Sequence, residues 1–272
     1  MDPTAEELET LRQIALEAGR GILEVYGTGV EVWDKDDSSP LTQADLQADA
    51  VICSGLARAF PAVPVLSEES GRTGSAASER LFLVDPLDGT KEFLKRNGEF
   101  TVNIALVEAG VPIAGVVLAP ALDECFFAAR GLGAWKTQDG EAVAIHASRY
   151  RPGAALRIIG SRSHGADRMN AWLETVTMDY RFTAAGSSLK FCRIAEGEAD
   201  VYPRLGPTSQ WDTAAAQCVL ECAGGCVLDL DGKPLRYGFD RATINPEFVA
   251  LGDRSLYATC CSGLRSSAPG ER

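Results

Sequence analysis

The fold of this chain is decided by one stretch, residues 81–90, which spells LFLVDPLDGT. Its first four residues form an apolar run that is typical of a buried strand, and a proline and a glycine then end that strand. Two carboxylates, Asp85 and Asp88, are thereby placed at a strand end, where open sheets position their chemistry. Magnesium prefers such oxygen ligands, and the hydroxyl of Thr90 is suited to positioning a water. The stretch outlines a magnesium-dependent phosphate hydrolase, although the same residue types also build ordinary turns.

Two further segments add acidic residues at the ends of predicted elements. Residues 65–69 spell VLSEE, a second short apolar strand that ends in Glu68 and Glu69. Residues 211–216 spell WDTAAA, which places Asp212 at the start of an alanine-rich helix. Taken in this order, the three segments resemble the inositol monophosphatase superfamily of lithium-sensitive, magnesium-dependent phosphatases. The resemblance extends from about residue 8 to about residue 250.

Two helices and a set of short strands are predicted in the first half of the chain. An amphipathic helix that begins with a capping box covers residues 4–26, and a second helix covers residues 42–60. Short strands between residues 81 and 135 predict an antiparallel, meander-like sheet against these two helices. Residues 72–78 are small and polar, and we expect a mobile surface loop there.

The pattern changes near residue 151 to alternating strands and helices, which indicates an α/β half. We therefore divide the chain into a half of residues 1–150 with most of the candidate metal ligands, and a half of residues 151–262 with the candidate substrate-binding residues and the last metal ligand. Residues 263–272 lack apolar anchors and are expected to form a disordered tail. The resemblance implies a mixed α/β fold, α+β in composition, with the α-β-α-β-α layers of the sugar phosphatases.

Composition excludes several classes of function. The net charge of −12 argues against a nucleic-acid-binding surface, and bound divalent cations would reconcile an acidic protein with an anionic substrate. No apolar run is long enough for an integral membrane segment, and no signal peptide is visible. The eight cysteines form no Cys-x-x-Cys pair and only two histidines are present, so a zinc site is poorly supplied. We expect a reduced, cytoplasmic protein; peripheral association with the inner membrane stays open, and a monomer is favoured although no motif fixes the oligomeric state.

The ligands of the metal site follow from the resemblance. Magnesium takes octahedral oxygen coordination and keeps several waters, so a few carboxylates and a substrate phosphate suffice. Magnesium ions that bridge a phosphate activate a water and stabilise the leaving oxygen. Glu69 is expected beside the site rather than on the metal. The implied ligands of Mg²⁺ are Glu68, Asp85, Asp88, Asp212 and the main-chain carbonyl of Leu87.

Asp45 has two interpretations that do not exclude each other. With Thr42 it fits an acidic variant of the capping box, and the local sequence favours this structural interpretation. The segment LTQAD, residues 41–45, also resembles the family segment whose aspartate pairs with the threonine of Asp-Gly-Thr. The resemblance therefore implies a catalytic pair in which Asp45 accepts a hydrogen bond from Thr90, and Thr90 orients the attacking water.

The second half supplies candidate anion-binding residues. Residues 186–190, GSSLK, predict a turn into a helix. Backbone N–H groups of this turn, together with Ser187, suit a phosphate, and Lys190 adds a positive charge. Arg204 follows another predicted strand, and His164 follows a third. Each of these residues alone is more typical of an ordinary surface position.

Longer motifs place the chain in one branch of the superfamily. The segment GSSLK is followed by AEGEADVYPR at residues 195–204, and the stretches TKEF, residues 90–93, and RNGEFTVN, residues 96–103, complete the pattern. Together they closely resemble the CysQ-type branch, the 3′(2′),5′-bisphosphate nucleotidases. Inositol monophosphatases typically have Thr-Asn-Phe after Asp-Gly-Thr, and fructose bisphosphatases typically have serine in place of that threonine.

That branch implies the hydrolysis of the 3′-phosphate of adenosine 3′,5′-bisphosphate to leave AMP, with 3′-phosphoadenylyl sulfate as a second substrate, in sulfur assimilation. One alternative is an inositol or sugar-phosphate phosphatase with the same metal centre. Another is a non-catalytic nucleotide-binding protein, which the intact set of ligands disfavours. A P-loop hydrolase is excluded because its motif is absent. The residues implied to bind substrate are Glu68, Leu87, Asp88, Gly89, Thr90, His164, Ser187, Lys190, Arg204 and Asp212.

Overall fold

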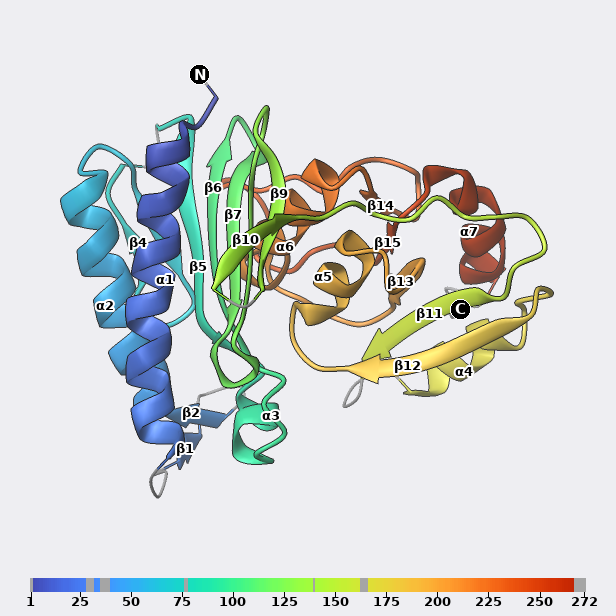
Figure 1. The fold of residues 1–272 in the computed structure, drawn as a ribbon, viewed down its shortest axis with the longest axis horizontal. Helices are drawn as coiled ribbons and strands as arrows, with labels where there is room; N and C mark the ends of the chain where they lie inside the picture. Colours follow the sequence, from blue (N-terminus) through green and yellow to red (C-terminus); the bar gives the residue numbers. More distant parts are fainter. Residues whose placement is uncertain are drawn as a thin grey trace.

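Two β-sheets, each covered by helices, build most of the molecule (Figure 1). The structure is a computed structural model, and it describes residues 2–27, 32–34, 40–75, 78–138, 140–161 and 166–266. The helices are α1 (Ala5–Tyr26), α2 (Gln43–Ala59), α3 (Thr90–Leu94), α4 (Ala166–Leu173), α5 (Leu189–Ala195), α6 (Gln210–Cys222) and α7 (Tyr257–Ser266), with 3₁₀ turns at Pro120–Leu122 and Arg254–Leu256.

The larger sheet contains the meander that the sequence predicts. Strands β5 to β10 pair with their neighbours in chain order and are antiparallel, whereas β3 joins β5 in parallel and β4 pairs antiparallel with β3. In spatial order the strands are β10 (Glu141–Ala144), β9 (Gly133–Gln138), β8 (Glu124–Ala129), β7 (Val111–Ala119), β6 (Thr101–Glu108), β5 (Arg80–Asp88), β3 (Val65–Ser67) and β4 (Gly71–Thr73).

The smaller sheet is mixed. Strands β12, β11 and β13 are parallel to one another, and β15 and β14 continue the sheet in antiparallel pairing. In spatial order the strands are β12 (Tyr180–Ala185), β11 (Leu156–Ser161), β13 (Val201–Arg204), β15 (Phe248–Leu251) and β14 (Cys226–Asp229). Strands β1 (Val32–Asp34) and β2 (Pro40–Thr42) form a separate antiparallel pair.

The layers follow the order α-β-α-β-α, as the resemblance implied (Figure 1). Helices α1 and α2 cover one face of the larger sheet, α5 and α6 fill the space between the two sheets, and α4 and α7 cover the outer face of the smaller sheet. Successive side chains of a strand point to opposite faces. Phe82 and Val84 of β5 therefore enter the core under α1 and α2, and Leu81 and Leu83 enter the central core. That central core contains residues from both sides of residue 150, and the division of the chain there stays a prediction.

Helix α6 packs very closely on the larger sheet. Gly115 in β7 lies under it, and a Cβ atom at this glycine would lie 2.3 Å from the carbonyl oxygen of Ala215. The absence of a side chain at Gly115 thus sets how near the start of α6 comes to the sheet.

Two predictions from the sequence are wrong in part. Residues 72–78 were expected to be a loop, but Gly71–Thr73 form β4, because pairing with β3 at the sheet edge outweighs low strand propensity; residues 76 and 77 lie outside the described residues. The disordered tail was expected from residue 263, but α7 continues to Ser266. Leu264 is fully buried in the outer core and is the apolar anchor that the prediction overlooked; residues 267–272 lie outside the described residues.

No helix within the described ranges is both long and apolar enough to span a membrane.

Candidate active site

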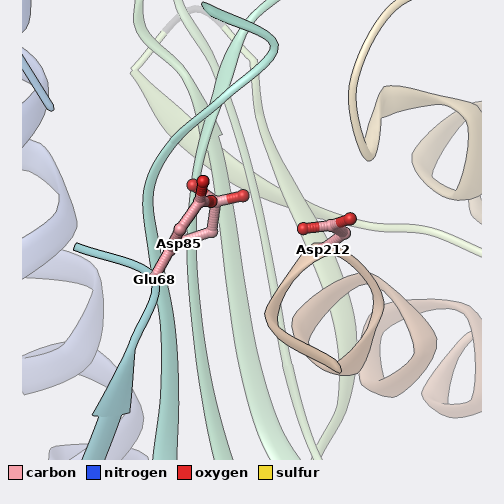
Figure 2. Close-up of side chains that lie close together, drawn as sticks. All are labelled: Glu68, Asp85 and Asp212. Atoms are coloured by element: carbon pink, nitrogen blue, oxygen red, sulfur yellow. The ribbon is translucent and has the colours of Figure 1, made fainter. Parts of the chain in front are cut away.

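Three carboxylates converge where the larger sheet faces α6. Glu68 follows β3, Asp85 belongs to β5, and Asp212 lies in the first turn of α6; each offers an oxygen within 4.8 Å of the other two. Figure 2 shows Glu68 and Asp85 together at the sheet, with Asp212 facing them from the helix. We call these three residues the acid cluster. Among the described residues, no other group of three or more His, Cys, Asp or Glu side chains is close enough to hold a metal ion.

Parallel pairing of β3 with β5 brings two members of the acid cluster together. Ser67 is opposite Val84 in the register of this pair. The N–H of the next residue, Glu68, donates to the carbonyl oxygen of Val84 at 3.1 Å. Glu68, directly after β3, and Asp85, within β5, consequently lie side by side.

A capping box places the third member. Ser209 is the N-cap of α6, and its backbone N–H donates to Oδ2 of Asp212 at 2.8 Å. A carboxylate in the first turn is also favoured by the positive end of the helix dipole. The capping box that begins α6 therefore also directs the carboxylate of Asp212 toward the larger sheet.

The acid cluster carries more negative charge than its surroundings can compensate. Burial, followed by the charges of Glu68, Asp88 and Asp212, raises the pKa of Asp85 well above its usual range. Burial and then the charge of Asp88 raise the pKa of Asp212 to about 8. A hard divalent cation relieves this repulsion, and an all-oxygen donor set is what Mg²⁺ selects. The residues thus fit a magnesium ion.

Asp88 lies beside the acid cluster and is held from the second half of the chain. Nδ2 of Asn103 donates to Oδ2 of the Asp88 carboxylate at 3.5 Å. The hydroxyl of Ser188 in turn donates to Oδ1 of Asn103 at 2.7 Å and lies 2.8 Å from the hydroxyl of Thr101. Asp88 is therefore oriented by a buried polar chain that links β6 to the start of α5.

Asp45 makes the hydrogen bonds that both interpretations require, and its catalytic role stays a prediction. Its Oδ2 accepts from the backbone N–H of Thr42 at 2.8 Å and from the Thr42 hydroxyl at 2.5 Å, as in a capping box. Its Oδ1 accepts from the hydroxyl of Thr90 at 3.3 Å. The same Thr90 hydroxyl lies 3.4 Å from the carbonyl oxygen of Leu87. Asp45 is only 1% exposed, so helix α2 holds a buried acceptor directly against Thr90.

A cleft of about 590 Å³ opens next to these groups. Asp88, Gly89, Thr90 and Asp212 line it. The lining also includes Tyr202, Pro203 and Leu205, which make part of the cleft apolar, as suits the ring of a base. Ser187, Lys190 and Arg204 also line the cleft.

The turn before α5 differs from the phosphate cradle that the sequence suggested. The N–H of Gly186 donates to Oε2 of Glu99 at 2.8 Å, so this donor is already used. Ser187 has a left-handed φ of 44°, and its buried Oγ has no hydrogen-bond partner within the described part of the chain. That hydroxyl, rather than the N–H of Gly186, is available to a ligand.

Two of the cationic side chains that line the cleft, Lys190 and Arg204, donate hydrogen bonds to main-chain oxygens. Nζ of Lys190 donates to the carbonyl oxygens of Ala185 and Ser187, and burial lowers the pKa of Lys190 to about 8 although Asp88 opposes this. Nε of Arg204 donates to the carbonyl of Gly206 at 3.1 Å. The positive charges are thus fixed in place beside the acid cluster.

A model of the inositol monophosphatase family matches residues 4–265. The chain belongs to the inositol monophosphatase family. This confirms the resemblance found in the sequence.

Curated relatives of this family member include proteins named 3′(2′),5′-bisphosphate nucleotidase CysQ. The one from Salmonella typhimurium is 46% identical over 245 residues, which covers 89% of this chain and 98% of the relative. The one from Escherichia coli K12 is 47% identical over the same coverage. Among solved structures, CysQ from Bacteroides thetaiotaomicron aligns with a TM-score of 0.79 and 36% identity over 92% of this chain and 98% of that one. SuhB from Bartonella henselae aligns with a TM-score of 0.80 and 28% identity, over 96% and 99%.

Within this member of the inositol monophosphatase family, the structure brings most of the predicted site residues together. The acid cluster contains three of the four predicted carboxylate ligands, and Asp88 lies next to them at the cleft. Glu68 and Leu87 do not line the cleft itself, and His164 lies outside the described residues.

Sequence reasoning missed the residues that position the site through hydrogen bonds across the fold. Asn103 and Ser188 are 85 positions apart, and Glu99 and Gly186 are 87 apart, so no local pattern links them. The only sequence signal for these residues was the motif RNGEFTVN, which contains Glu99 and Asn103. The motif indicated the branch of the superfamily, but it assigned no role to either residue.

Proposed function

We propose that this member of the inositol monophosphatase family is a magnesium-dependent phosphatase that removes the 3′-phosphate of adenosine 3′,5′-bisphosphate to give AMP and phosphate. The observation that carries the proposal is the acid cluster at one end of a cleft that also holds Lys190 and Arg204. The CysQ relatives support the choice of substrate. Hydrolysis of 3′-phosphoadenylyl sulfate, a place in sulfur assimilation, a monomeric state and a cytoplasmic location complete the proposal.

The acid cluster, the carboxylate of Asp88 and the carbonyl oxygen of Leu87 would hold the magnesium. When bound, Mg²⁺ neutralises charge on the phosphate oxygens, favours ionisation of a water and stabilises the leaving oxygen. The chain itself supplies orientation. The Thr90 hydroxyl gives its proton to Asp45 Oδ1, so its lone pairs are directed to accept a proton from the attacking water. Asp45, as a buried carboxyl acceptor, would take up the proton that Thr90 passes on.

Further residues that line the cleft would select the substrate. The hydroxyl of Ser187, which has no hydrogen-bond partner among the described residues, and the ammonium of Lys190 would bind the ribose and the phosphate that is not cleaved. Arg204 adds positive charge, and the apolar part of the cleft lining would contact adenine. His164 stays part of this proposed set. Glu68, Leu87, Asp88, Gly89, Thr90 and Asp212 would contact the scissile phosphate directly or through the cation.

Phosphate release from a panel of substrates tests the proposal. We expect adenosine 3′,5′-bisphosphate to give a kcat/KM at least tenfold above those of inositol 1-phosphate and fructose 1,6-bisphosphate. Activity should vanish in excess chelator, return with Mg²⁺ and be inhibited by lithium. Asp88→Asn should retain less than about a tenth of the turnover, a loss of at least about 1.4 kcal/mol of barrier stabilisation.

Two outcomes would favour the alternatives. A kcat/KM for inositol phosphate equal to or above that for the nucleotide would indicate an inositol or sugar phosphatase with the same metal centre. Tight nucleotide binding without release of phosphate from any substrate would indicate a binding protein.

A further inference from the structure

Helix α2 carries a second buried carboxylate that the proposed mechanism does not use. Asp49 lies one turn after Asp45 and is 7% exposed. Its Oδ1 accepts from the hydroxyl of Ser67 at 2.5 Å, from the hydroxyl of Ser70 at 3.2 Å and from the thiol of Cys53 at 3.5 Å. Three donors on a single oxygen make Asp49 the centre of a small polar cluster.

Two of these donors lie on either side of Glu68. Ser67 is the last residue of β3, and Ser70 immediately precedes β4. Glu68 and Glu69 therefore occupy a turn whose two ends are bonded to the same carboxylate oxygen. On the other side, the N–H of Glu68 is bonded to the carbonyl of Val84. The backbone of Glu68 is thus fixed from α2 and from β5 at once.

This arrangement has a physical consequence for a cation site. Ser67 is only 1% exposed, so water competes little for its hydrogen bond to Asp49. Without the Asp49 oxygen, the two serines lose the acceptor that they share, and the turn can relax by the fraction of an ångström that ligand geometry does not tolerate.

We propose that Asp49 is a positioning residue for the cation site and that it acts through Ser67 and Ser70 to fix the carboxylate of Glu68. The inference rests on the proposed function, since Glu68 must be a ligand for its position to matter. Helix α2 then has two roles at i and i+4: Asp45 holds Thr90 and Asp49 holds the turn of Glu68.

The test measures binding of Mn²⁺, used as a probe for Mg²⁺, to the full chain without substrate, by the electron paramagnetic resonance signal of the free ion. We expect Asp49→Ala to raise the dissociation constant about tenfold to thirtyfold, within the range of about 10- to 100-fold seen for groups that orient metal ligands. Asp49→Asn should raise it less, because the amide oxygen still accepts hydrogen bonds. Ser67→Ala should raise it about threefold. In assays, the Mg²⁺ concentration for half-maximal activity should rise in the same order, while the KM for substrate at saturating Mg²⁺ stays within twofold.

Ile52→Val is the matched control. Ile52 is fully buried in the same helix but takes no part in the polar cluster. This variant should lose thermal stability and keep the wild-type Mn²⁺ affinity within twofold, which separates positioning from a general loosening of α2.

Each remaining outcome decides the question. A folded Asp49→Ala with wild-type Mn²⁺ affinity would overturn the inference alone. If Asp49→Ala does not fold, an unchanged affinity in Ser67→Ala would overturn it. Wild-type affinity in Glu68→Gln would instead show that Glu68 is not a ligand, which would remove the cation site of the proposed function and this inference with it.

Discussion

Ser188 donates its hydroxyl to Oδ1 of Asn103 at 2.7 Å, and this bond joins the helical layer between the sheets to the larger sheet. Ser188 therefore acts on Asp88 through Asn103, whose amide reaches Oδ2 of Asp88 at 3.5 Å. Ser187, the residue before it, has a buried hydroxyl without a hydrogen-bond partner within the described residues.

The two adjacent serines should respond differently to alanine. Ser188→Ala removes the hydroxyl that bonds to Oδ1 of the buried Asn103 and to the Thr101 hydroxyl, and it should lower the free energy of unfolding by about 1–3 kcal/mol, with a loss of turnover. Ser187→Ala removes an unsatisfied hydroxyl, so its stability should stay the same or rise while its KM for the nucleotide increases. Denaturant unfolding and kinetics on both variants check this. Equal loss of stability in the two variants would contradict the assignment.

Substitution of Lys190 should change the preference between substrates, whereas substitution of Thr90 should slow the reaction of every substrate. Lys190→Ala should lower kcat/KM for adenosine bisphosphate about tenfold to a hundredfold, because a charged contact to phosphate is worth roughly 1.5–3 kcal/mol. It should affect inositol phosphate much less, since that substrate lacks the second phosphate. Thr90→Val disturbs the shared water and should reduce kcat/KM for both substrates alike. A uniform loss in Lys190→Ala would place Lys190 in the common site or in the structural support of its own turn.

The metal-free protein should be more stable in mild acid than in mild alkali. An unfolded aspartate has a pKa of about 3.9, whereas the folded pKa of Asp212 is raised to about 8 and that of Asp85 is raised as well. Between these values the folded state binds more protons than the unfolded state, so the free energy of unfolding falls as pH rises from about 4 to about 8.

Thermal unfolding in chelator between pH 5 and pH 8 measures this slope. Asp212→Asn should flatten it, because the variant lacks one of the titrating groups, and Mg²⁺ should stabilise the wild type most at pH 8. A wild-type slope that matches the slope of Asp212→Asn would argue against strong repulsion in the acid cluster.

Gly115→Ala tests how the sheet positions Asp212. The new Cβ would lie 2.3 Å from the carbonyl of Ala215, so α6 must move, and overpacking of this kind typically costs about 1–3 kcal/mol. Turnover should fall as well, because α6 carries Asp212. Gly21→Ala is the control: this helical glycine has no neighbouring atom within 4 Å, and the change should stabilise α1 by up to about 1 kcal/mol with full activity. Wild-type turnover in Gly115→Ala would show that the site tolerates a shift of α6.

Local patterns predicted the parts of the site that are built locally. The capping box of Thr42 and Asp45 spans three residues, and its geometry is as expected. The apolar run before Asp85 is a strand whose side chains are buried on both faces. Periodicity and capping depend on neighbours in sequence, so both were visible without the fold.

Contacts across the fold could not be predicted in this way. The N–H of Gly186 was expected to be available for a phosphate, but Glu99 occupies it from a loop 87 positions earlier. Strand β4 forms because it pairs with β3 at the edge of the sheet, and composition does not reveal this pairing. The assembly of the acid cluster was predicted only through the resemblance, because nothing in the residues around Asp212 indicates that they face Glu68.

The order in which the chain is synthesised determines when the central core can form. Helices α1 and α2 leave the ribosome first and can cover one face of the larger sheet as it forms, but the opposite face, with Leu81 and Leu83, is covered by α5 and α6, which follow much later. A nascent chain that ends before residue 210 therefore presents an apolar sheet face to water or to a chaperone. Asp212 arrives with the helix that closes this face. The carboxylate of Asp212 thus joins those of Glu68 and Asp85 only when α6 covers the apolar face of the sheet. A partly synthesised chain therefore has neither a complete core nor a complete site.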